Sequence, residues 1–275
     1  MENYSVLISV YHKDDPEHLR HALESLSNQI HKPSQIVLVK DGAIGDNLIS
    51  VVADFVNSST LKVDILALSK NVGLGNALNA GLQVVENQLV GRMDADDICI
   101  SDRFLKQVDF MNQNPEISVV GAYVEEFNVH PGDIGNVRKL PLKSEDIKRF
   151  AKYRNPLNHP SVMFRKQDVI SVGSYEHMPL FEDYYLWVRM LLKGYKMANI
   201  PSVLLNFRTG NDMIGRRHGL SYLRYELKFY LQLKKLGFLR MNEVIKVLML
   251  RIPLRLIPKR LLRKFYSLFL RSKKV

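Results

Sequence analysis

Over its first 125 residues the chain alternates short apolar runs with segments of helical periodicity, and this alternation limits the fold more than any other feature. The apolar runs cover residues 5–10, 35–39, 62–68, 88–93 and 117–124. The helical segments cover residues 17–29, 48–56, 73–85 and 103–111. Apolar strands joined by helices are typical of parallel sheets covered on both faces. The sequence therefore predicts an α/β fold with a mainly parallel central sheet.

Polar residues follow several of these runs at the point where each predicted strand ends. Tyr11, Asp41 and Asn71 follow the first three runs, and Asp94 follows the fourth. Because crossovers between parallel strands are right-handed, the loops at their carboxyl ends share one edge, where ligands usually bind. We expect the binding site at this edge.

The fourth run ends in a cluster of acids, Asp94-Ala95-Asp96-Asp97. Carboxylates crowded at a strand end are unfavourable unless a cation or hydrogen-bond donors offset their repulsion. Two acids one residue apart can hold one hard cation, which in turn can bridge a diphosphate. The alternative is a solvated acidic turn in which Asp97 caps the next helix. The position after an apolar strand favours the metal site.

A second acid pair, Glu182 and Asp183, begins a predicted helix over residues 181–192. Both acids can simply complement the helix dipole. A carboxylate held near aromatic rings can instead have a raised pKa and act as a base toward a hydroxyl group. The pair alone leaves both interpretations open.

Three further features are weak when taken alone. Residues 70–75 resemble a phosphate-binding loop, but a full G-x-G-x-x-G pattern and a Walker lysine are missing. His159 can line a pocket, although a lone histidine is more often structural. Arg208 follows a strand-like segment over residues 203–207 and can cover an anionic leaving group or belong to a polar loop.

A single cysteine, Cys99, excludes a disulfide framework and a zinc site built from several thiolates. The first residues lack the basic segment of an export signal, so we expect a cytoplasmic protein.

The positive charge of the chain is concentrated in residues 216–275. This segment has 17 Lys and Arg against two acids, a net charge of +15, whereas the preceding 215 residues carry −4. After Pro258 the apolar and basic residues separate onto two helix faces. Since no run is long and apolar enough to span a bilayer, we expect a basic amphipathic helical region that packs over residues 220–236 and lies on an anionic membrane surface over residues 244–271.

Five ordered motifs together resemble glycosyltransferase family 2, and bacterial enzymes of amylovoran, capsule and O-antigen biosynthesis in particular. The motifs lie between about residues 4 and 215 and are SVLISVYHKDDPEHLRHALESLSNQ, IVLVKDG, LSKNVGLGNALNAGL, VGRMDADD and FEDYYLWVRML. The resemblance implies a Rossmann-like nucleotide-sugar-binding domain of the glycosyltransferase A type over residues 1–215. Residues 1–125 would bind the donor and residues 126–215 would carry the acceptor and catalytic part.

The resemblance also implies roles for single residues. Asp183 matches the catalytic base, supported by Glu182, and Asp96 matches the ligand of Mg²⁺ or Mn²⁺, with Asp94 toward the ribose. The expected donor-binding residues are Ser9, Val10, Tyr11, Asp41, Asn71, Gly73, Arg92, Asp94 and Asp96. On the acceptor side we expect His159, Trp187 and Arg208.

The implied reaction is an inverting transfer of galactose or glucose from a UDP-sugar. The acceptor would be N-acetylglucosamine or N-acetylgalactosamine on undecaprenyl diphosphate, joined by a β-1,3 link at the inner face of the plasma membrane. UDP-GlcNAc, UDP-GalNAc and dTDP-rhamnose are alternative donors, and a homo-oligomer is left open.

Two other classes are less consistent with the sequence. A nucleic-acid-binding tail needs cations but no wide apolar face. A sugar-nucleotide pyrophosphorylase would carry a glycine-rich signature after the first strand, which is absent here.

Overall fold

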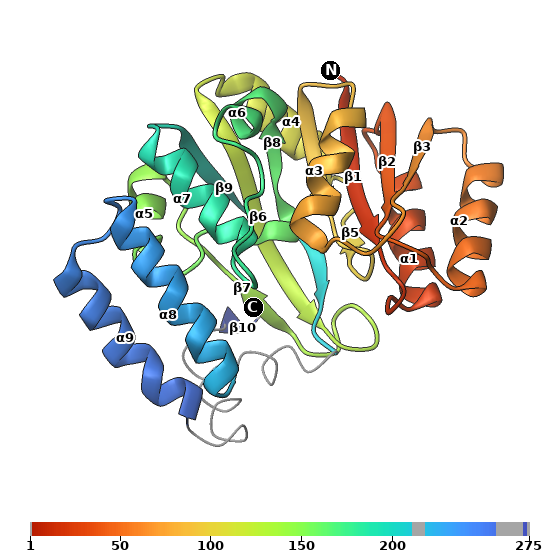
Figure 1. Cartoon of the computed structure of the whole chain (residues 1–275). Coiled ribbons are helices and arrows are strands. Elements are labelled where there is room, and N and C mark those ends of the chain that lie inside the picture. Colours follow the sequence, from red (N-terminus) through yellow and green to blue (C-terminus); the bar gives the residue numbers. More distant parts are fainter. Residues whose placement is uncertain (1, 211–217, 257–271, 274–275) are drawn as a thin grey trace.

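The computed structural model describes residues 2–210, 218–256 and 272–273 (Figure 1). The strands are β1 (Tyr4–Val10), β2 (Gln35–Lys40), β3 (Val63–Ala67), β4 (Leu89–Met93), β5 (Ile98–Cys99), β6 (Ile117–Phe127), β7 (Asn136–Arg138), β8 (Met163–Arg165), β9 (Lys196–Arg208) and β10 (Ser272–Lys273). The helices are α1 (Pro16–Ser27), α2 (Asp46–Ser58), α3 (Leu74–Val84), α4 (Arg103–Gln113), α5 (Ser144–Phe150), α6 (Lys166–Ser171), α7 (Glu182–Leu192), α8 (Leu220–Lys235) and α9 (Met241–Leu256), with a 3₁₀ turn, η1, over His159–Ser161.

The described strands form one curled sheet in the order β10-β7-β6-β8-β4-β1-β2-β3, with β9 beside β6 and β5 beside β9. The strands from β4 through β1 and β2 to β3 are all parallel, as the alternating pattern predicts. Strand β8 enters antiparallel between β4 and β6, and β6 and β9 run parallel to each other. The predicted α/β fold with a mainly parallel sheet is confirmed.

Two hydrophobic clusters cover the two faces of this sheet. One cluster lies between the sheet and α3, α7, α8 and α9, and contains Leu7, Val39 and Trp187. The other lies against α1, α2 and α4, and contains Val10 and Phe104. Side chains of successive β1 residues alternate between the clusters because successive side chains of a strand point to opposite faces.

Helices α8 and α9 form a hairpin that packs on α7 (Figure 1). Tyr222, Phe229, Tyr230 and Leu233 of α8 and Val244 and Val247 of α9 are buried. The expectation that residues 220–236 pack is therefore met by one face of α8, but α9 packs as well. The apolar face predicted after Pro258 and the proposed boundary at residue 215 lie outside the described residues. Within the described residues, the structure contains no helix with the length and apolar character needed to cross a membrane.

Candidate active site

The loop after β2 and the loop before α3 meet at the carboxyl edge of the sheet. The Asp41 carboxylate accepts hydrogen bonds from the backbone N–H groups of Val72 (2.7 Å) and Gly73 (3.1 Å). The Asn71 side chain donates to the Asp41 carbonyl (3.2 Å). A Cβ atom on Gly42 would lie 2.5 Å from the Asn71 nitrogen, so only glycine allows this approach. Asp41 thus holds the loop before α3 and is itself only 3% exposed.

The acidic cluster after β4 brings three carboxylates together. One oxygen from each of Asp94, Asp96 and Asp97 lies within 4.8 Å of the others. Burial, followed by repulsion from Asp94, raises the pKa of Asp96 to about 6. The same causes raise the pKa of the fully buried Asp97 well above its ordinary value. The cluster therefore places carboxyl groups where water solvates their charged forms poorly.

Two arginines partly offset this charge. Arg92, at the end of β4, forms an ion pair with Asp94 and is 1% exposed. Arg208, the last residue of β9, lies beneath the cluster: its backbone N–H donates to Asp97 (2.9 Å) and its Nε donates to the Asp96 carbonyl (2.9 Å). Asp97 does not cap α4, because β5 and the Asp102 cap position separate it from that helix.

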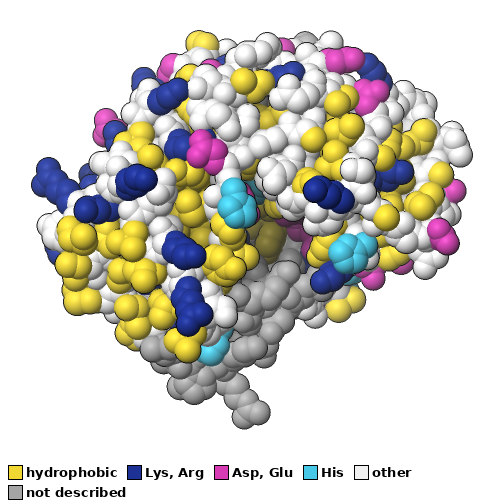
Figure 2. Space-filling model, viewed as in Figure 1, with side chains coloured by type: hydrophobic (Ala, Val, Ile, Leu, Met, Phe, Trp, Pro, Cys, Tyr) yellow, Lys and Arg dark blue, Asp and Glu magenta, His cyan; other side chains and the backbone are white. Residues whose placement is uncertain are grey.

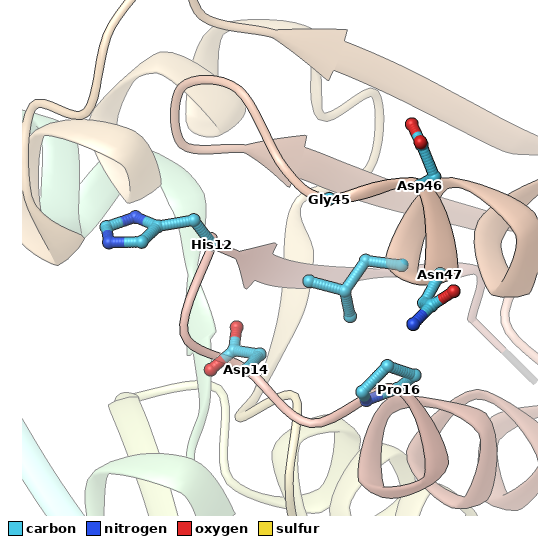
Figure 3. Close-up of a pocket in the computed structure, with 7 residues that line it drawn as sticks. His12, Asp14, Pro16, Gly45, Asp46 and Asn47 are labelled. Atoms are coloured by element: carbon cyan, nitrogen blue, oxygen red, sulfur yellow. The ribbon is translucent and has the colours of Figure 1, made fainter.

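A fourth carboxylate, Asp14, faces the cluster from the loop after β1. It accepts a hydrogen bond from the Tyr11 N–H (2.9 Å). Burial is the main cause that raises its pKa to about 7, and repulsion from Asp96 and Asp94 adds to it. Asp14 also lines a cavity of about 360 Å³, which His12 and the first turn of α2 bound from two sides (Figure 3).

The second acid pair begins α7, as predicted. The Asp183 carboxylate accepts a hydrogen bond from the Asn155 side-chain amide (2.6 Å). Glu182 packs on the first turn of α3, where a Cβ on Gly75 would lie 3.3 Å from its Cγ. Burial raises the pKa of Glu182, and the Asp183 charge adds to this effect.

Tyr175 is buried and is affected by the charges of both acid groups. Its hydroxyl group bonds to His159 Nε2 (2.8 Å), and its backbone is held by two hydrogen bonds to the Asn79 side chain. Burial raises the pKa of the Tyr175 phenol, the Arg92 charge opposes this effect, and the Asp183 and Asp94 charges add to it. Burial and the Arg92 charge lower the pKa of His159 well below its ordinary value, which keeps the imidazole neutral near pH 7.

Three of the expected site residues are buried. Val10 is fully buried, and its carbonyl accepts from the Asp41 N–H. Trp187 is also fully buried, with its ring edge-on to that of His159. Arg208 is held at the acidic cluster by its hydrogen bonds to Asp97 and Asp96. The expected roles of Val10 on the donor side and of Trp187 and Arg208 on the acceptor side stay predictions.

The remaining expected residues lie at or beside the sheet edge. Ser9 and Tyr11 are partly exposed at the end of β1, and Gly73 is exposed at the start of α3. No sequence pattern indicates Asn155 or Tyr175, whose contacts span long stretches of chain. Asp14 lies in the first motif, three residues after Tyr11, and an acidic residue at this strand end is the sequence feature that indicates it.

The acidic cluster is suited to a hard divalent cation. It offers carboxylate oxygens from three residues, and Asp97 Oδ2 is buried without a hydrogen-bond partner among the described residues. Oxygen ligands with a net negative charge are those that Mg²⁺ and Mn²⁺ prefer. The raised pKa of Asp96 shows that the charge lacks full compensation from the protein itself.

The family model "Glycosyl transferase family 2" matches residues 5–173, which include the acidic cluster and Asn155. The chain belongs to glycosyltransferase family 2. Its similarity to curated members of the family extends beyond the matched region. It is 45% identical over 240 residues to the amylovoran biosynthesis glycosyltransferase AmsE of Erwinia amylovora, covering 86% of this chain and 89% of that protein.

A second relative in the family has a defined reaction in its name. The chain is 34% identical over 270 residues to the UDP-Gal:alpha-D-GlcNAc-diphosphoundecaprenol beta-1,3-galactosyltransferase of Escherichia coli, covering 95% of this chain and 97% of that protein. Both relatives are glycosyltransferases, and the chain is therefore a glycosyltransferase.

Solved structures agree on the fold. The S. aureus TarS 1–349 complex with UDP-GlcNAc has a TM-score of 0.65 at 15% identity and covers 97% of this chain and 73% of that chain. The mannosyltransferase PcManGT of Pyrobaculum calidifontis, in complex with GDP-Man and Mn²⁺, has a TM-score of 0.62 at 16% identity and covers 97% and 79%. The family fold is thus the glycosyltransferase A type.

The raised pKa of Asp14 predicts a pH dependence of stability. The folded protein keeps this carboxyl protonated up to about pH 7, whereas the unfolded chain releases the proton near pH 4. The contribution of Asp14 to the free energy of unfolding therefore falls as pH rises from about 4 to about 7. We expect metal-free Asp14→Asn to gain thermal stability over the wild type at pH 7.5, and to gain much less at pH 5. A difference in melting temperature that stays constant between these pH values contradicts the assignment.

Proposed function

We propose that the protein transfers galactose or glucose, with inversion, from a UDP-sugar to an N-acetylhexosamine linked to undecaprenyl diphosphate. The product would be a β-1,3-linked disaccharide on the lipid, used in O-antigen, capsule or exopolysaccharide assembly. The observation that carries the proposal is the cluster of three carboxylates, Asp94, Asp96 and Asp97, after β4, together with the Asp183 carboxylate that Asn155 holds at the first turn of α7. The 34%-identical galactosyltransferase supports the choice of donor and acceptor.

In the proposed reaction the two acid groups have different tasks. Asp96, with Asp94 beside it, would hold Mg²⁺ or Mn²⁺. When bound, the cation neutralises the charge of the departing UDP. Asp183 accepts the proton of the acceptor hydroxyl as that oxygen attacks the anomeric carbon from the face opposite the leaving group. A single displacement of this kind inverts the anomeric configuration.

The donor side is formed by the loops that Asp41 joins. Tyr11 and Ser9 at the end of β1, and Asn71 and Gly73 before α3, would contact the nucleotide. Arg92 is fully buried, and two of its nitrogen atoms, Nε and Nη1, have no hydrogen-bond partner among the described residues. A buried cation with free donors favours an anionic or oxygen-rich ligand next to it.

The identity of the donor is tested by a panel of nucleotide sugars with synthetic GlcNAc- and GalNAc-diphosphate-lipid acceptors, with and without EDTA. We expect transfer from UDP-Gal or UDP-Glc, lost in EDTA and restored by Mn²⁺ or Mg²⁺. Transfer only from UDP-GlcNAc, UDP-GalNAc or dTDP-rhamnose would replace the proposed donor, because a single pocket contact can change donor preference. Full activity in EDTA would contradict the metal site.

We also propose that the protein is cytoplasmic and binds the inner face of the plasma membrane through residues 216–275. Figure 2 shows hydrophobic side chains beside Lys and Arg side chains over α8 and α9. Nine of the nineteen large hydrophobic side chains exposed in the described part of the chain lie between residues 220 and 252: Leu220, Tyr225, Leu227, Leu231, Met241, Ile245, Met249, Leu250 and Ile252. The exposed cations among them are Arg224, Lys228, Lys234, Lys235, Arg240 and Lys246.

This composition favours an anionic lipid surface over nucleic acid. Apolar side chains gain from burial at the headgroup boundary, and each nearby cation adds about 1 kcal/mol of attraction to anionic lipid. Phosphate binding in nucleic acid needs the cations but leaves the apolar side chains in water. Both helices of the hairpin contribute, one face of each being packed on the domain and the other exposed.

The membrane proposal predicts the effect of polar substitutions on this outer face. We expect Leu231→Ser, Ile245→Ser and Met249→Ser, combined in the full chain, to reduce co-sedimentation with phosphatidylglycerol-containing vesicles several-fold. Ile30→Ser with Ile49→Ser, two exposed positions outside the hairpin, is the matched control and should bind as the wild type does. Equal co-sedimentation of the triple variant and the wild type would show that the hairpin face does not contact lipid.

A further inference from the structure

The only two acidic residues after residue 215 both serve to hold the α8–α9 hairpin. Glu226 of α8 is fully buried and accepts hydrogen bonds from Arg251 (2.9 Å) and Arg255 (2.7 and 2.8 Å) of α9. Glu243 of α9 accepts one from Lys152 (2.6 Å) of the catalytic domain. Both acids of this segment, whose net charge is +15, therefore bind basic side chains.

Side chains of the α8–α9 hairpin contact the turn at residues 151–155. Arg251 Nη2 and the Tyr230 hydroxyl (3.0 Å) both donate to the Tyr153 carbonyl, and the next residue but one is Asn155. The Lys152–Glu243 ion pair holds the same turn from α9. Three side chains of the hairpin therefore contact a segment of only five residues.

This turn supplies the hydrogen-bond donor to Asp183. Asn155 Nδ2 donates to Asp183 Oδ2 at 2.6 Å. The hairpin also packs on the start of α7, where Phe181 stacks on Phe229 of α8 with ring centroids 4.6 Å apart. The hairpin thus contacts both the segment that carries the donor and the helix that carries the acceptor of this bond.

We propose that the α8–α9 hairpin positions the Asp183 carboxylate, through the 151–155 turn and Asn155. The proposal rests on the proposed role of Asp183 as the base. A hydrogen bond to a carboxylate fixes its orientation and favours its charged form. Since small misplacements of a reacting group lower catalytic rates strongly, loosening the turn lowers the rate without touching the donor site. Asn155 and Tyr230 are positioning residues on this view.

The test uses the full chain with two substitutions that preserve side-chain size. Tyr230→Phe removes one of the two donors to the Tyr153 carbonyl, and Glu243→Gln removes the ion pair with Lys152. The matched control is Tyr195→Phe with Glu86→Gln, which removes a phenol contact to Ser171 and an ion pair with Lys62. Asn155→Ala, alone and added to the first pair, completes a double-mutant cycle.

We expect the Tyr230/Glu243 variant to lose about tenfold in kcat, with KM for the UDP-sugar within about twofold of wild type. Its acid limb in the kcat–pH profile moves to higher pH, because the displaced Asn155 donates a weaker hydrogen bond to the Asp183 carboxylate. Adding Asn155→Ala causes little further loss, since both changes act on one hydrogen bond. The control variant keeps wild-type kcat.

Three results would overturn the proposal: unchanged kcat in the variant, fully additive losses with Asn155→Ala, or a parallel loss of kcat, donor binding and melting temperature. If the pair of substitutions prevents folding, Tyr230→Phe alone is measured in the same way. Carboxyl ¹³C NMR titration of Asp183 needs no acceptor, and its midpoint should rise in the variant and in Asn155→Ala. If the wild type transfers no sugar, the proposed function fails while this titration still decides the positioning of Asp183.

Discussion

We expect Asp96→Ala to abolish sugar transfer and to remove the metal dependence of UDP binding. Asp96 is a half-buried carboxylate between Asp94 and Asp97, and burial and the Asp94 charge raise its pKa to about 6. Removing it takes away a ligand oxygen from the place where negative charge is concentrated. The Lewis acidity of a metal ion stabilises the transition state by several kcal/mol, and Asp96 would be one of its direct ligands. We therefore expect kcat to fall at least about 10²-fold.

Isothermal titration of UDP, with and without Mn²⁺, measures this prediction directly. In the wild type Mn²⁺ should tighten UDP binding, and in Asp96→Ala it should not. Asp54→Ala, at an exposed aspartate of α2, controls for the loss of one negative charge. Metal-enhanced UDP binding that persists in Asp96→Ala would place the cation elsewhere. The experiment is best run near pH 7.5, because protons compete with the cation for carboxylates whose pKa is raised.

The parallel half of the fold could be predicted because its signal is local. Each strand from β1 to β4 is a short apolar run, and each connection shows helical periodicity, so neighbouring residues alone determine the elements. The polar residues at these strand ends, such as Asp41 and Asp94, follow from the same rule about sheet edges. The antiparallel entry of β8 between β4 and β6 has no such local signal, because it depends on which distant strands pair.

The contacts that complete the site could not be predicted for the same reason. Asn155 reaches Asp183 and Asn79 holds Tyr175 only after the chain has folded, and a lone asparagine has many structural roles. Trp187, which the resemblance suggests for the acceptor side, lies on the buried face of α7. Helix periodicity, applied to α7, places Trp187 in the core.

The basic tail illustrates how charge alone underdetermines structure. Its net charge of +15 suggested that one part packs and another contacts lipid. In α8 and α9 the division is instead between the two faces of each helix, because α8 and α9 both carry buried and exposed apolar residues. The two acids mark the packed side, where Glu226 is fully buried and Glu243 reaches Lys152. An acidic residue in an otherwise basic segment thus indicates which side of its helix is packed.

We expect Asp183→Ala to leave UDP and metal binding intact and to abolish transfer, which would separate it from Asp96→Ala. Asp183 stands at the first turn of α7 and accepts a hydrogen bond from Asn155, whereas Asp94 and Asp96 follow β4. Loss of a general base lowers rates by about 10²–10⁴-fold. Asp183→Asn keeps the shape but not the proton acceptor, so it should be equally inactive.

The neighbouring acid provides a graded comparison for this prediction. Glu182 packs on α3 beside Gly75, and Glu182→Gln keeps that packing while removing one charge near Asp183. We expect Glu182→Gln to retain a measurable share of the wild-type kcat, and Asp183→Asn to retain almost none. Initial rates with saturating UDP-sugar and Mn²⁺ measure both. An Asp183→Ala enzyme with near-normal turnover would exclude Asp183 as the base, and because the two acids share one helix turn, Glu182 would then be the carboxylate to test in that role.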